Sequence, residues 1–135
     1  MKEKVENARK FITAGKAIFT IRNGKTGNRF TYRVKKCKDK DIWFVSVLTG
    51  TDNEHSYTYM GSIFNTTFRS TAKSKITADA ISYKAFSYTW SMLLENKLPN
   101  CIEIWHEGRC GRCGRVLTVP ESIKSGFGPE CINFI

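Results

Sequence analysis

Three cysteines near the C-terminus constrain the fold of this chain more than any other feature. Cys110 and Cys113 form a C-x-x-C pair with a glycine after each cysteine, and 17 residues separate the pair from Cys131. The glycines let the backbone bend around a sulfur-bound ion, as in a zinc knuckle. The separation is long enough for a short hairpin, and Gly128-Pro129 place Cys131 in the first turn of a terminal helix. This spacing predicts a treble-clef-like structural zinc site.

A structural zinc site needs four ligands. His106 is the favoured fourth ligand because it lies four residues before Cys110, and Cys101 or a ligand from elsewhere are the alternatives. With four protein ligands the ion has no open position for water, so we expect it to stabilise the fold. A thioredoxin-like redox pair is the competing reading, but that motif opens a helix early in a βαβ unit, whereas this one lies between glycines near the C-terminus.

Four segments alternate apolar and polar residues or are apolar throughout, and they predict strands. They cover residues 17–22, 30–35, 42–48 and 57–64. The first two are joined by turn residues and predict a hairpin with one apolar and one basic face, and the third is expected to be central. A further alternating segment, 101–105, is typical of an edge strand, and residues 68–75 are expected to form a polar loop.

Helical periodicity appears at residues 5–12 and from Thr77 to about Leu98, where Phe86, Trp90, Leu93 and Leu94 share a face. The predicted fold is therefore α+β: a four-stranded, mostly antiparallel sheet with a packed helix and the zinc module. Residues 1–100 form the basic β-rich part and 101–135 the zinc-binding module, together expected to make one compact unit.

The net charge of +10 is confined to the first 40 residues, which carry 13 Lys or Arg and three acids. Such a density of cations favours phosphate backbones or acidic protein surfaces, although a solvated face kept soluble by charge has the same signature. The residues expected to meet a partner are Arg22, Lys25, Arg29, Arg33, Lys35 and Lys36. Tyr32, Tyr57 or Tyr59 would stack on bases if that partner were DNA or RNA.

No catalytic motif is present, and the chain is not expected to be an enzyme. The only histidine besides His106 is His55, expected in a solvated turn. The first ten residues alternate charges and lack the apolar run of a signal peptide, so we expect a reducing, cytoplasmic location without a membrane span.

The segment Cys110-Gly-Arg-Cys-Gly-Arg-Val-Leu-Thr-Val-Pro-Glu-Ser-Ile-Lys-Ser-Gly-Phe-Gly-Pro-Glu-Cys131 resembles the signature of a small domain of unknown function found in phage and actinobacterial proteins. The resemblance implies a phage or prophage source, a bacterial host cell as location, and zinc at the three cysteines with His106. It implies no reaction.

Two functions fit these expectations. The favoured one is a counter-defence inhibitor, similar to zinc-containing anti-CRISPR proteins, that binds a host nucleic-acid-handling effector. The +10 charge argues against an acidic DNA mimic. The alternative is direct DNA or RNA binding through the basic hairpin.

Overall fold

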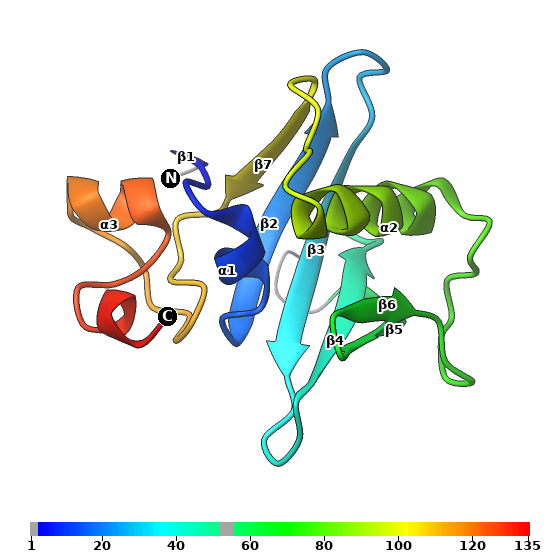
Figure 1. Ribbon diagram of the computed structural model, residues 1–135, viewed down its shortest axis with the longest axis horizontal. Coiled ribbons are helices and arrows are strands. Elements are labelled where there is room, and N and C mark those ends of the chain that lie inside the picture. Colours follow the sequence, from blue (N-terminus) through cyan, green and yellow to red (C-terminus); the bar gives the residue numbers. More distant parts are fainter. Residues whose placement is uncertain (1–2, 52–55) are drawn as a thin grey trace.

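A single antiparallel sheet forms the centre of the computed structural model, which describes residues 3–51 and 56–135 (Figure 1). Its order is β1-β7-β2-β3-β4-β5-β6. The strands are β1 (Glu3–Lys4), β2 (Lys16–Asn23), β3 (Arg29–Lys36), β4 (Ile42–Leu48), β5 (Tyr57–Phe64), β6 (Thr67–Arg69) and β7 (Ile102–His106). The helices are α1 (Ala8–Ile12), α2 (Ile81–Leu94), α3 (Pro120–Ser125) and the 3-10 turn η1 (Cys131–Phe134).

The mixed α+β class is confirmed, and the four predicted strands correspond to β2, β3, β4 and β5 within one residue at each end. The prediction of four strands is wrong, because the described residues form seven. The alternating segment at 101–105 becomes β7, which lies between β1 and β2 and not at an edge. Because β7 belongs to the sheet, both predicted parts, 1–100 and 101–135, contribute strands to the same sheet.

Strand β6 falls where a polar loop was expected. A two-residue turn, Asn65-Thr66, connects it to β5, and both residues have positive φ, 50° and 64°. This is the backbone of a type I′ hairpin turn, which usually contains asparagine followed by glycine. Because threonine occupies the second turn position, the sequence lacks the Asn-Gly signal that predicts such a hairpin.

Both predicted helices are shorter in the structure. Asn7 caps α1 by accepting a hydrogen bond from the backbone N–H of Lys10 at 3.3 Å, while Val5 pairs with Ile104 as part of the sheet. Helix α2 starts after Ala80, which has no side-chain cap. It ends where Asn96 adopts a left-handed conformation with φ of 57°, before Pro99 is reached.

The core lies on the sheet face that α1 and α2 cover (Figure 1). Phe19 of β2 contacts Phe11 of α1 and Phe86 of α2, with ring centroids 6.4 and 6.3 Å apart. The Tyr32 side chain is fully buried beside them, and its hydroxyl donates to the carbonyl of Ser82 at 2.7 Å. The opposite sheet face, called the outer face below, carries the alternate residues of each strand.

Candidate metal centre and basic sheet face

The structure brings together the three cysteines that the spacing singled out. The sulfur atoms of Cys110, Cys113 and Cys131 lie within 4.8 Å of one another. Cys110 and Cys131 are buried, whereas Cys113 is half-buried. A cluster of three thiols that could hold a metal ion is thus present in the fold, formed by the C-x-x-C knuckle (Cys110 to Cys113) and by the first residue of η1.

The knuckle turns tightly because of its glycines. The N–H of Gly114, whose φ is 82°, donates to the carbonyl of Cys110 at 2.9 Å. Gly111 lies so close to α1 that a Cβ atom there would sit 2.7 Å from the ring of Phe11. Gly111 is therefore required by its packing against α1, and Gly114 by its backbone conformation.

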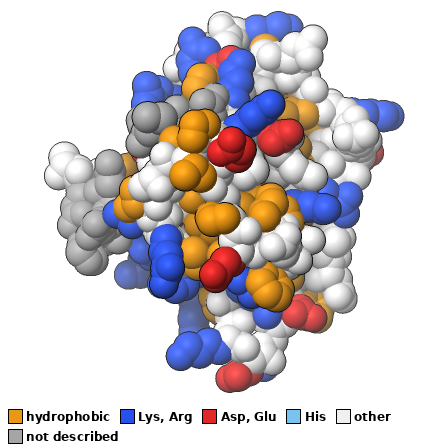
Figure 2. All heavy atoms as spheres, turned by 90° about the vertical axis from the view of Figure 1, so that its left-hand side faces the viewer, with side chains coloured by type: hydrophobic (Ala, Val, Ile, Leu, Met, Phe, Trp, Pro, Cys, Tyr) orange, Lys and Arg blue, Asp and Glu red, His pale blue; other side chains and the backbone are white. Residues whose placement is uncertain are grey.

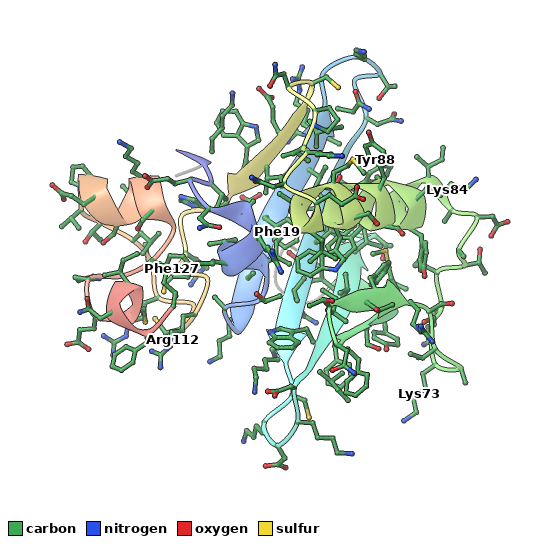
Figure 3. All side chains as sticks on the ribbon, in the orientation of Figure 1. Phe19, Lys73, Lys84, Tyr88, Arg112 and Phe127 are labelled. Carbon is green, nitrogen blue, oxygen red and sulfur yellow. The ribbon has the colours of Figure 1, made fainter. Side chains whose placement is uncertain are left out.

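Two hydrogen bonds reach the sulfur atoms from their surroundings. The backbone N–H of Gly128 donates to Cys110 at 3.4 Å, and an Arg112 Nη1–H donates to Cys131 at 3.5 Å. The Arg112 guanidinium also lies over the ring of Phe134, 4.5 Å from its centroid, and points toward the C-terminal turn (Figure 3). Donors of this kind stabilise thiolates and orient them as metal ligands.

The cysteines differ in their acidity. Burial raises the pKa of Cys110, but hydrogen bonds from the N–H of Gly128 and from the knuckle outweigh it and leave the pKa below its usual value. The pKa of Cys131 is raised, first by desolvation and despite the Arg112 hydrogen bond. Because thiolates are the ligands of soft metals, the donor set fits zinc or another thiophilic ion.

His106 is placed differently from its prediction as the fourth ligand. It is fully buried at the end of β7, where Gly108 N–H donates to Nδ1 at 2.9 Å and Nε2 contacts the carbonyl of Ile123. Both ring nitrogens are therefore engaged by backbone groups. Pairing of β7 with β2 aims this side chain into the core beside Phe11, and His106 is not part of the group formed by the three thiols.

The alternative ligand, Cys101, lies at the other end of β7, where its carbonyl accepts a hydrogen bond from Gly24 N–H at 2.7 Å. Within residues 3–51 and 56–135, the metal-ligand group consists of the three cysteines alone. His55 lies outside the described residues. A fourth ligand thus stays a prediction.

The basic residues expected to bind a partner are divided between the faces of the sheet. Strand register places Lys16 opposite Lys35, and Arg22 opposite Arg29, all on the outer face. Arg33 is on the same face, over the ring of Tyr57 at 4.6 Å from its centroid. Lys25 is exposed in the β2–β3 turn.

Lys36 belongs to the other face. It follows the buried residues Tyr32 and Val34 at period two, lies over the ring of Trp43 at 5.8 Å, and forms an ion pair with Asp41 at 3.5 Å. The buried Tyr32 is likewise unable to stack on a base, so the prediction for this residue is wrong.

Aromatic side chains accompany the cations of the outer face. Tyr59 packs against Phe44, with ring centroids 6.2 Å apart, and the Phe44 side chain is 42% exposed. Trp105, which no local motif marks as part of a binding face, contributes to a hollow of about 300 Å³ that Arg22 and Arg29 also line. The pairing of β7 with β2, which places Trp105 opposite Thr20, brings its side chain to the outer face.

Carboxylates neutralise part of this face. Glu103 pairs with Lys4 at 2.9 Å and with Arg22 at 3.1 Å, and these two cations hold the pKa of Glu103 below its usual value. Thr20 donates to Glu107 at 3.2 Å. Within the described part of the chain, Lys16 and Lys35 have no such ion-pair partner.

The C-terminal module also exposes apolar side chains. Figure 2 shows orange hydrophobic groups gathered on the face turned toward the viewer, with blue and red charged groups among and around them. The large exposed apolar residues of this module are Val116, Val119, Ile132, Phe134 and Ile135. Two of them, Val116 and Val119, line a hollow of about 460 Å³ that Cys113 and Cys131 also line.

The model of a family of unknown function, DUF6011, matches residues 105–132. The match covers the end of β7, the three cysteines and α3, so the C-terminal module is similar to that family while the rest of the sheet lies outside the match. No curated protein and no solved structure matches the chain. Among the described residues, no helix is long and apolar enough to span a membrane.

Proposed function

We propose that this chain is a non-enzymatic, metal-stabilised binding module that engages nucleic acid through the outer face of its sheet. The observation that carries the proposal is the pairing of cations across β2 and β3, Lys16 with Lys35 and Arg22 with Arg29. Like charges directly opposite each other destabilise a sheet. Glu103 already offsets part of the charge of Arg22, whereas Lys16 and Lys35 have no ion-pair partner among the described residues. A polyanion on this face would relieve the remaining repulsion, and the neighbouring aromatic rings offer surfaces on which bases stack.

The metal in this proposal is zinc, held by Cys110, Cys113 and Cys131. Three thiols within 4.8 Å of one another support a soft ion, and zinc is the usual ion of structural sites rich in cysteine. Bound there, it would neutralise thiolate charge and tie the knuckle to η1. Metal analysis of the purified protein tests this directly: one zinc per chain is expected, and Cys113→Ser should reduce it.

A counter-defence inhibitor that binds an acidic patch of a host effector remains the second candidate. The same cationic face supports it, because acidic proteins and phosphate backbones attract the same charges. The aromatic rings among the cations favour nucleic acid over an acidic protein as the partner, because aromatic faces stack on bases of any sequence.

Fluorescence anisotropy with labelled single- and double-stranded oligonucleotides tests the proposal. At salt near 150 mM, binding should be measurable. The logarithm of the association constant should fall linearly with the logarithm of the salt concentration. The double variant Arg22→Gln/Arg29→Gln should weaken binding, whereas Lys97→Gln, a charge change beyond the end of α2, should not. Absence of binding to either oligonucleotide would reject nucleic acid and leave the protein partner.

A further inference from the structure

A hollow lies where the sheet meets the C-terminal module that carries the three cysteines, called the metal module below. It brings Arg33 and Lys35, which the sequence predicted as partner-binding residues, together with Lys16 and Arg109, which it did not. Its volume is about 260 Å³, and a water molecule occupies roughly 30 Å³ of liquid, so a phosphate group with several waters fits. Its lining residues are Lys16, Ile18, Arg33, Lys35, Arg109 and Gly114. Four of these six carry positive charge, and none is acidic.

Lys16 is held at the junction by the backbone. Its N–H donates to the carbonyl of Gly111 in the knuckle at 2.8 Å, which ties the first residue of β2 to the metal module. Across the ladder, Lys16 faces Lys35, and Ile18 faces Arg33. Three cations of the hollow therefore come from the outer face of two paired strands.

Arg109 comes from the module and directly precedes Cys110. Its Nη1–H donates to the carbonyl of Gly114 at 3.2 Å, and its backbone pairs with Val116 in an isolated bridge. Since Gly114 follows Cys113, the thiol cluster and the Arg109 side chain depend on the same turn. Folding of the knuckle sets the position of the fourth cation.

We propose that this hollow is a phosphate seat for the backbone of a nucleic acid, and that the metal module completes it. The inference rests on the proposed function. Four cations around one concavity provide the charge that a phosphodiester needs, and the unpaired Lys16 and Lys35 have no competing carboxylate in the described part of the chain. Metal loading and nucleic-acid binding are then coupled, and the coupling is reciprocal.

The deciding experiment compares Arg109→Gln with Arg115→Gln in the zinc-loaded protein. Both arginines are exposed residues of the module, but only Arg109 lines the hollow. Binding of a labelled single-stranded oligonucleotide of about 15 nucleotides is measured at several salt concentrations. We expect Arg109→Gln to weaken binding and to reduce the slope of log affinity against log salt by about one, with Arg115→Gln close to wild type.

A second arm removes the metal with a chelator. Metal removal should weaken binding by wild type more than binding by Arg109→Gln, because the variant has already lost the contact that the knuckle positions. If Arg109→Gln and Arg115→Gln change the affinity and its salt dependence equally, the hollow is not a phosphate seat. The proposed function would still stand. A wild type that binds no oligonucleotide overturns the proposed function itself.

Inorganic pyrophosphate distinguishes the source of the phosphate. If the wild type binds the oligonucleotide and pyrophosphate displaces it, and this displacement is lost in Arg109→Gln, the hollow is a seat for backbone phosphate. If pyrophosphate stabilises the wild type against heating while the oligonucleotide does not bind, the seat takes a free phosphate compound and the nucleic-acid assignment is overturned.

Discussion

At the residue scale, His106 is held by backbone groups on both ring nitrogens. Gly108 N–H donates to one nitrogen and the carbonyl of Ile123 lies against the other, so the side chain joins β7 to α3. Its ring also contacts Phe11 at a centroid distance of 5.9 Å. Burial with two hydrogen-bonding groups supports a structural role for this histidine.

Replacement of His106 by alanine tests whether this residue stabilises the fold or serves as the fourth metal ligand. We expect the free energy of unfolding to fall by about 2–4 kcal/mol, because a cavity forms and two backbone groups lose their partner. Zinc content should stay near one per chain. Urea denaturation and metal analysis measure the two quantities, and loss of the zinc from a folded variant would restore His106 as the fourth ligand.

Gly111 provides a second test at this scale. A Cβ atom there would lie 2.7 Å from the Phe11 ring, so Gly111→Ala should destabilise the protein by about 1–3 kcal/mol through overpacking. Gly128→Ala is the matched control, because nothing lies within 4 Å of a Cβ atom at that position. Thermal unfolding should separate the two variants, and equal stabilities would mean that Phe11 moves aside without cost.

At the scale of elements, the strand ladders determine which side chains share a face. A register shift between Val45 and Ser46 places Ser46 opposite Tyr59, whereas Phe44 lies opposite Ser62. Without this bulge, strict alternation from Ile63 would turn Tyr57 and Tyr59 toward the core. The bulge therefore brings both tyrosines to the face that carries Arg33 and Lys35.

The hairpin between β5 and β6 carries a measurable strain. Thr66 has φ of 64°, a conformation that costs L-residues about 1–2 kcal/mol and that glycine adopts freely. Thr66→Gly should raise the free energy of unfolding by up to about 1 kcal/mol, after the extra entropy of glycine in the unfolded chain is subtracted. The hydrogen bond from Trp90 Nε1 to the carbonyl of residue 66 is retained.

Thr67→Gly in the adjacent strand is the control for this prediction. Thr67, the first residue of β6, lacks the positive φ, so glycine there should lower stability through its greater freedom in the unfolded chain. Urea unfolding of both variants decides the point, and a destabilised Thr66→Gly would contradict the assignment of strain to this turn.

At the scale of the whole molecule, the metal module and the sheet share one core. The Phe127 ring lies 5.8 Å from Phe11, which in turn contacts Phe19 of the sheet (Figure 3). The buried apolar side chains of the module itself are few, with Leu117 and Phe127 the largest. Many small metal-binding domains fold only with their metal bound, and we expect the same of this module.

Chelation is therefore expected to loosen the module before the sheet. Hydrogen exchange measured by mass spectrometry should accelerate in residues 108–134 and change little in β2, β3 and β4. Lower pH should favour metal loss, because protons compete with the metal for the thiolates of Cys110, Cys113 and Cys131. Uniform acceleration across the chain would indicate a single cooperative unit.

Local patterns in the sequence determined the four long strands, the grouping of the three cysteines, and the confinement of excess charge to the first 40 residues. These features depend on neighbours in the chain, through period-two alternation and short metal-ligand spacing. Only the tertiary structure decided that β7 lies between β1 and β2, and that His106 is buried. It also decided that Arg109 lines the same hollow as Lys16 and Lys35. The reason is that strand pairing between distant segments fixes which face each side chain occupies, and a one-residue shift reverses it.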